Sequence, residues 1–242
     1  MSFLPAIRRV TQSEPAYWLL AACALFLIAG AGLRPLSLPD EGRYVDVAWE
    51  MLNSGNWLVP TLDGMPFFHK PPLFYWITAA AFKLFGAHAW AGRLASTLSA
   101  IAIMVAMHAF VRRHRDAATA NLTAVILTTQ PFFFGAAQFA NLDMLVASMI
   151  SLTVLCAADA SIAIQENRHY KRPLAAAYVF AALGVLAKGL IGFLLPAIII
   201  LVWLALKKKT AIFFRLLNLP LMGLFLLIAG SWFVAMQWEF PE

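Results

Sequence analysis

Acids and lysines at the ends of apolar segments are the residues of this chain whose types and spacing suit catalysis. Asp40 and Glu41 are adjacent carboxylates, and Asp143 lies at the start of a long apolar run. Lys70 directly precedes Pro71-Pro72, a pair that suits the first turn of a helix. Carboxylates can orient or deprotonate an acceptor, and a lysine can stabilise a departing anion.

Each of these residues also has a structural interpretation, which the sequence alone leaves open. Asp40 suits the N-cap of a helix, and Glu41 suits the first helical turn, where the helix dipole favours acids. Lys70 either binds an anion at a helix N-terminus or extends to lipid headgroups. Lys188, next to Gly189, either binds an anion or marks a helix junction.

His69, beside Lys70, is a candidate metal ligand or acid-base group because histidine titrates near neutral pH. The chain contains no HExxH, CxxC, Walker A or GxSxG pattern, which excludes the usual classes of zinc protease, NTPase and α/β-hydrolase. A divalent metal therefore stays an open question, and no metal ligand is assigned.

The elements that position these residues are apolar helices. The 242 residues are 62% hydrophobic and 12% charged, with a mean hydropathy of +0.77. Ordinary soluble domains are roughly 45–50% apolar and about 25% charged. This composition excludes a soluble or disordered protein, and Cys23 and Cys156 lie inside apolar runs, which excludes a small disulfide scaffold.

Uncharged runs predict an all-α fold, a polytopic membrane bundle of about seven transmembrane helices. The fifth and sixth runs are the weakest pair, because residues 173–206 number only 34 for two crossings, and they meet near Lys188 and Gly189. The runs are Pro15–Leu33, Leu94–Val111, Ala117–Leu142, Met144–Ala158 with a continuation beyond Asp159, Pro173–Ala187, Gly189–Leu206 and Leu216–Trp238.

The basic residues predict the orientation of these helices. Twelve of the eighteen lie on alternate connections, so the positive-inside rule places the N-terminus in the cytoplasm and the C-terminus outside. The net charge of +6 thus reflects topology, and no nucleic-acid partner is expected. The twelve are Arg8, Arg9, Arg112, Arg113, Arg115, Arg168, Lys171, Arg172, Lys207, Lys208, Lys209 and Arg215.

The connection 34–93 differs from the others because it is about 60 residues long and holds five of the twelve acids. It predicts an amphipathic helix along the membrane that ends at Gly55, followed by a turn at Asp63-Gly64. Its seven aromatics between Phe67 and Phe85 form an interfacial belt or flank a lipid chain. The apolar stripe of that helix is Val45, Ala48, Trp49 and Leu52, and the polar side is Arg43, Asp46 and Glu50.

The run DEGRYVDVAWEMLNSGNWLVPTLDGMPFFHKPPLFYWITAAAFKLFGAHAWAGRLAS resembles the first periplasmic loop of bacterial GT-C glycosyltransferases that use polyprenyl-phosphate sugars. This group contains protein O-mannosyltransferase-like enzymes and the aminoarabinose transferases that modify lipid A. The resemblance continues through ANLDMLVAS, LAKGLIGFLLPAI and SWFVAMQWEFPE, and so covers nearly the whole chain in the same order.

The resemblance implies a bacterial inner-membrane enzyme with an active site facing the periplasm. It implies that Asp40 is the leading catalytic carboxylate, that Arg43 and Tyr44 belong to the same motif, that Lys70 contacts the carrier phosphate and that Asp143 is the second acidic position. The implied donor is a polyprenyl-phosphate-linked sugar that is transferred with inversion. The implied acceptor, which reaches the site among membrane lipids, is a lipid A-like glycolipid, another glycan or a protein, and no nucleotide is expected.

Four further residues complete the candidate site: Glu41 as a catalytic acid, and His69, Arg93 and Lys188 as substrate-binding residues. The aminoarabinose branch commonly reads EKPP where this chain reads HKPP, which puts any metal contact of that glutamate in doubt. Because family members continue further, we expect residues 1–242 to be the N-terminal part of a GT-C-like catalytic module, with residues 34–93 as its outer loop.

Two other classes of function compete with this interpretation. A transporter or flippase for lipid-linked sugars would place charged or broken helices at the bilayer midplane and show an inverted repeat, and no such repeat is visible. A non-catalytic membrane partner subunit would keep the fold without activity, and incubation with a lipid-linked sugar distinguishes it from an enzyme.

Overall fold

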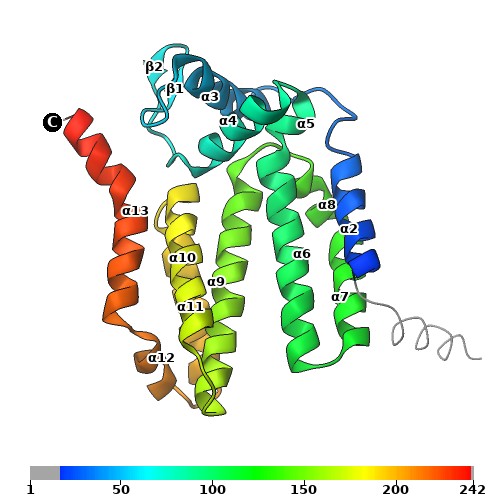
Figure 1. The fold of residues 1–242 in the computed structure, drawn as a ribbon, viewed down its shortest axis with the longest axis vertical. Helices are drawn as coiled ribbons and strands as arrows, with labels where there is room; N and C mark the ends of the chain where they lie inside the picture. Colours follow the sequence, from blue (N-terminus) through cyan, green and yellow to red (C-terminus); the bar gives the residue numbers. More distant parts are fainter. Residues whose placement is uncertain (1–16, 241–242) are drawn as a thin grey trace, which may run out of the picture.

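The computed structural model describes residues 17–240, a bundle of long helices capped at one end by short helices and a hairpin (Figure 1). The predicted basic pair Arg8-Arg9 and the predicted start of the first run at Pro15 lie outside the described residues. The bundle contains α2 (Tyr17–Ala29), α6 (Leu94–His114), α7 (Ala117–Thr129), α8 (Pro131–Ala137), α9 (Leu142–Gln165), α10 (Lys171–Lys188), α11 (Ile191–Leu206), α12 (Ala211–Leu216) and α13 (Leu219–Glu239). The cap contains α3 (Asp40–Ser54), β1 (Thr61–Leu62), β2 (Met65–Pro66), α4 (Leu73–Phe85) and α5 (Ala89–Gly92).

Helix α9 lies at the centre of the bundle and packs against α6, α10 and α11, while α13 packs on α10 (Figure 1). Within residues 17–240, α6, α9 and α13 are long and apolar enough to cross a membrane, and α2, α4, α7 and α11 are shorter apolar helices. The helices predicted from the other runs are present, and the count of seven crossings stays a prediction. Large apolar side chains such as Leu226 and Leu227 of α13 are exposed, as a lipid-facing surface requires.

The uncharged run Ala117–Leu142, which predicts one crossing, contains two helices in the structure. Helix α7 ends at Thr129, and α8 begins at Pro131 after Gln130 adopts an extended backbone. Proline has no N–H to donate and its ring disfavours helical geometry at the preceding residue, so the helix ends there. The side chain of Gln130 then caps α8 by accepting a hydrogen bond from the Phe133 N–H.

The predicted junction between the fifth and sixth runs is confirmed. Helix α10 ends at Lys188, and Gly189 has φ 84°, a conformation that glycine adopts readily. After this turn, Gly184 of α10 and Gly192 of α11 bring their backbones into direct contact. The α10–α11 junction lies beside the start of α9, where Lys188 contacts Asp143.

The cap forms its own core, in which α3 lies against α4 and both rest on the start of α9. The predicted stop of α3 is confirmed by Gly55 at φ 70°, and Asp63 and Gly64 both have the positive φ that a type I′ hairpin turn requires. Val47 and Met51 are fully buried although they fall outside the predicted apolar stripe, because α3 has packing partners on more than one side. The Trp232 indole of α13 donates to the Leu58 carbonyl at 2.9 Å, which joins cap and bundle.

Candidate active site

A polar cavity of about 210 Å³ lies where the cap meets the bundle. It is bounded by the start of α3, the segment before α4, the start of α9 and the end of α10. Five of the predicted site residues thus meet in one place, although they are up to 148 positions apart in the sequence, from Asp40 to Lys188. The lining residues are Asp40, Tyr44, Lys70, Asn141, Leu142, Asp143 and Lys188.

Asp40 is the first residue of α3, and the structure corrects its predicted role as an N-cap. Pro39 occupies the cap position, and no side chain caps this end of the helix. The Asp40 carboxylate instead accepts a hydrogen bond from Arg43 Nη2 at 2.8 Å and is 59% exposed. Arg43 also lies over the Tyr44 ring, 5.1 Å from its centroid. The carboxylate is therefore oriented by a cation but open to a substrate.

Lys70 lies immediately before the N-terminus of α4, as its position before the proline pair predicts. Helix α4 begins at Leu73 after Pro72, and the first N–H groups of a helix have no partners within it. No ion pair joins Lys70 to another residue in the range 17–240, and its side chain is half-buried in the cavity wall. A lysine beside free amides and a positive helix end is suited to an anion such as phosphate.

Asp143 and Lys188 form an ion pair across the opposite wall of the cavity. Asn141 caps α9 by accepting the Asp143 N–H at 3.0 Å, which fixes Asp143 in the first turn. Lys188 is the last residue of α10, where the negative end of the helix dipole favours a cation. Since Asp143 neutralises Lys188 and Asp40 contacts Arg43, Lys70 is the cavity's lysine without a carboxylate partner among the described residues.

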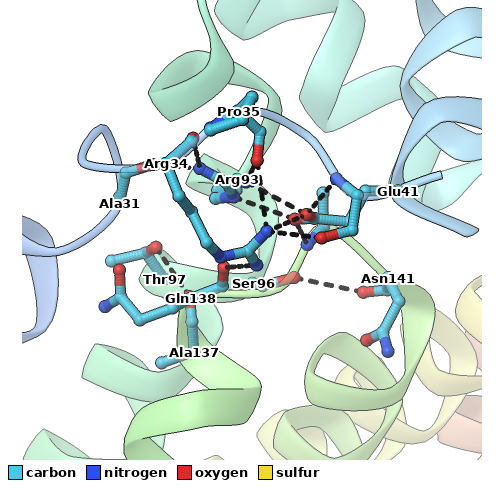
Figure 2. Close-up of polar contacts among 12 residues, drawn as sticks. Ala31, Arg34, Pro35, Glu41, Arg93, Ser96, Thr97, Ala137, Gln138 and Asn141 are labelled. Atoms are coloured by element: carbon cyan, nitrogen blue, oxygen red, sulfur yellow. Dashed lines mark hydrogen bonds and ion pairs between the residues drawn. The ribbon is translucent and has the colours of Figure 1, made fainter.

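Glu41 and Arg93 lie outside the cavity, in a fully buried ion pair (Figure 2). Arg93 donates to both Glu41 carboxylate oxygens, at 2.8 and 3.0 Å, and to the carbonyls of Ala31, Arg34 and Pro35. The predicted catalytic role of Glu41 and substrate-binding role of Arg93 do not agree with this placement, because neither side chain reaches solvent. Both side chains instead fix nearby backbone segments in place through hydrogen bonds to backbone groups.

The buried cluster positions the start of α3 relative to α9. The Glu41 carboxylate also pairs with Arg34 and accepts the backbone N–H groups of Ser37 and Ala140, each at 2.8 Å. Burial alone would raise the pKa of Glu41, but these hydrogen bonds from Arg93, Arg34, Ala140 and Ser37 lower it to about 2. The ionised Glu41 carboxylate therefore connects α3, the helix that begins with Asp40, to the segment that carries Asn141.

Sequence reasoning did not identify Arg34 and Asn141. Arg34 is 7 positions from Glu41 and Arg93 is 52 positions away, so no local spacing reveals the cluster. Asn141 carried a usable signal, because asparagine before a long apolar run is a preferred N-cap.

His69 lies outside the polar cavity and stacks on Phe67 with ring centroids 4.5 Å apart. Across residues 17–240, no three His, Cys, Asp or Glu side chains lie close enough together to hold a metal ion. The donor set of the described residues therefore provides no ready cage for a divalent cation.

The fold is a bundle of apolar helices, and its cap brings two aspartates and two lysines around one polar cavity. These features define a polytopic membrane protein with a polar site at the helix ends. Residues 69–234 match the model of the dolichyl-phosphate-mannose-protein mannosyltransferase family, and the chain belongs to that family.

Relatives and solved structures agree with this assignment. The chain is 33% identical over 197 residues to an undecaprenyl phosphate-alpha-4-amino-4-deoxy-L-arabinose arabinosyl transferase of Enterobacter sp., which covers 79% of this chain and 34% of the relative. The enzyme of that name from Pseudomonas savastanoi is 30% identical over 192 residues, covering 79% of this chain and 36% of the relative. The chain thus spans about a third of these relatives' length.

The fold is similar to two crystal structures of ArnT from Cupriavidus metallidurans. The apo structure has a TM-score of 0.86 at 26% identity and covers 94% of this chain and 42% of that one. The structure bound to undecaprenyl phosphate has a TM-score of 0.84 at 27% identity, covering 95% and 43%. These likenesses confirm the predicted fold class, a multi-pass helical membrane protein of the GT-C type.

Proposed function

We propose that the polar cavity is the part of a membrane glycosyltransferase that moves a sugar from a polyprenyl-phosphate carrier to an acceptor with inversion. The observation that carries this proposal is the pairing of an open carboxylate, Asp40, with an uncompensated lysine, Lys70, in one cavity at a helix end. A similar fold is named as bound to undecaprenyl phosphate, which supports an undecaprenyl-phosphate-linked donor here.

In the proposed reaction, the bond between the sugar and the carrier phosphate breaks while a bond to the acceptor forms. Negative charge develops on the carrier phosphate, and Lys70 with the free amides of α4 stabilises it. Asp40 takes the proton of an acceptor hydroxyl, or orients the acceptor if that group is an already ionised phosphate. Arg43 holds the Asp40 carboxylate in place by donating a charge-assisted hydrogen bond to it.

Asp143 and Lys188 form the second wall and position the groups that bind between the helices. The Asp143 carboxylate is 64% exposed even though it contacts Lys188, so it retains lone pairs for sugar hydroxyls. The arabinosyl transferases of the relatives support a pentose as the transferred sugar, and a lipid A-like glycolipid as the acceptor follows from the family resemblance. We place the cavity on the periplasmic side of a bacterial inner membrane, in agreement with the distribution of basic residues.

The direct test is binding of undecaprenyl phosphate to the purified chain in neutral detergent, measured by native mass spectrometry. Lys70→Gln removes a charge-assisted contact to phosphate and should weaken binding by about 10- to 100-fold. Lys83→Gln is the matched control, because Lys83 is exposed in the last turn of α4 and outside the cavity. Equal affinities for Lys70→Gln and the parent would contradict the proposal.

A further inference from the structure

A second cavity extends from the middle of the bundle to α12, the short helix at the end of the bundle opposite the cap. Figure 1 shows the position of α12 at that end. The cavity has a volume of about 120 Å³ and is lined by residues of α9, α10, α11 and the short helix α12. Its lining is almost entirely apolar, and the hydroxyl of Tyr178 is already engaged, donating to the Leu216 carbonyl at 3.0 Å and accepting from the Asn218 N–H at 3.3 Å. Apolar cavities of this size do not hold water favourably but accept hydrocarbon.

A basic residue, Arg215, lies beside the lining of this cavity. Arg215 lies in α12 between the lining residues Phe213 and Leu216, and its guanidinium lies over the Tyr170 ring, 5.9 Å from the centroid. Tyr170 is one helical turn before Leu174, which also lines the cavity, and the Leu174 N–H donates to the Tyr170 carbonyl at 3.1 Å. Arg215 is therefore held within one turn of the apolar lining.

Further basic side chains surround Arg215. Lys209 hydrogen-bonds to Gln165 at the end of α9, which brings the α11–α12 connection beside the α9–α10 connection. Glu166, the acid in this connection, is already paired with Arg168. The other basic residues here have no ion-pair partner within residues 17–240, and all are exposed. They are Lys171, Arg172, Lys207, Lys208 and Arg215.

We propose that this face binds an anionic phospholipid, with its headgroup phosphate on Arg215 and the lysines at 207–209 and one acyl chain in the apolar cavity. Charge complementarity selects the headgroup, since a basic cluster beside a membrane helix attracts anionic lipids. The apolar cavity favours a lipid over a soluble anion, because a lipid can place an acyl chain in it and a soluble phosphate cannot. The exposed Phe214 of α12, 71% accessible, places this short helix against the surrounding lipid.

The test is titration of the purified chain in neutral detergent with phosphatidylglycerol and with phosphatidylcholine of equal chain length, followed by native mass spectrometry. We expect preferential binding of phosphatidylglycerol. Lys207→Gln with Arg215→Gln should weaken it by about 25-fold, because each basic residue contributes about fivefold. Arg112→Gln with Arg115→Gln is the matched control and should change little. Both residues are exposed at the same end of the bundle, Arg112 in the last turn of α6 and Arg115 directly after that helix.

A second pair of variants tests the cavity without changing charge. Ala197→Leu fills the cavity and should weaken the binding of phosphatidylglycerol by about fourfold for each methylene of the acyl chain that it excludes. Ala205→Leu is the control and should leave binding unchanged, because Ala205 is exposed on the same helix and lies outside the lining. Equal losses in the two charge variants would show diffuse attraction and overturn the site. Unchanged binding in Ala197→Leu would overturn the acyl-chain part of the proposal.

Discussion

The buried cluster around Glu41 makes the cap a precise scaffold, and Glu41→Gln tests it. The substitution keeps the shape of the side chain but leaves the Arg93 guanidinium buried without its counter-charge, between three carbonyls and an amide. Removing one partner of a buried ion pair costs about 3–5 kcal/mol. For a chain of this size, such a loss lowers the melting temperature by about 10 °C.

The measurement is thermal unfolding of purified variants in one detergent, followed by intrinsic fluorescence and by size-exclusion chromatography of the heated samples. Asp46→Asn is the matched control, because it makes the same carboxylate-to-amide change on the same helix at a side chain that forms no ion pair in the described structure. A double variant, Glu41→Gln with Arg93→Met, should recover part of the lost stability, because it removes the unpaired charge.

Two results would refute this reasoning. If Glu41→Gln melted within a degree or two of Asp46→Asn, the pair would contribute nothing to holding the cap. If the Arg93→Met and Glu41→Gln losses simply added in the double variant, the two residues would act independently and the geometry of the cluster would be irrelevant.

Three further predictions concern pH, packing and the wall of the cavity. The pKa of Glu41 is lowered from 4.5 to about 2, so the ionised Glu41 stabilises the folded chain fully above pH 4.5 and loses this effect toward pH 2. The melting temperature of the parent should therefore fall more steeply across this window than that of Glu41→Gln. Gly192→Ala should destabilise the chain by about 1–3 kcal/mol in thermal unfolding, since its Cβ meets the backbone of Gly184, whereas Gly223→Ala, with open space around it, should not; equal melting temperatures would contradict this. Asn141→Ala removes the cap of α9 and should cost about 1 kcal/mol in the same assay; a stability equal to the parent's would show that the cap is dispensable.

Much of the fold follows from local signals in the sequence. The Asp63-Gly64 pair specified the hairpin turn because both residues tolerate positive φ, and Gly55 specified the end of α3 for the same reason. The Lys188-Gly189 junction was visible because a charge and a glycine interrupt an apolar run. The break at Gln130-Pro131 was equally local, and it was missed because the run was divided by charges alone.

The candidate site was predictable only in part. Asp40, Lys70 and Asp143 stand at helix ends, where local rules already suggest chemistry, and their meeting in one cavity depends on how the cap docks on the bundle. Glu41 differs from Asp40 by one position, which turns its side chain about 100° around the helix toward the interior. No spacing rule predicts that its partner is Arg93, because that contact depends on tertiary packing.

The most direct test of the central claim is transfer of labelled sugar from an undecaprenyl-phosphate donor to membrane acceptors, with the complete gene product in membranes. Asp40→Asn should reduce transfer by at least about 100-fold while undecaprenyl phosphate still binds, as expected for loss of a general base or orienting carboxylate. Asp63→Asn is the control, because Asp63 lies exposed in the hairpin turn outside the cavity. Transfer by Asp40→Asn at the rate of Asp63→Asn would contradict the account.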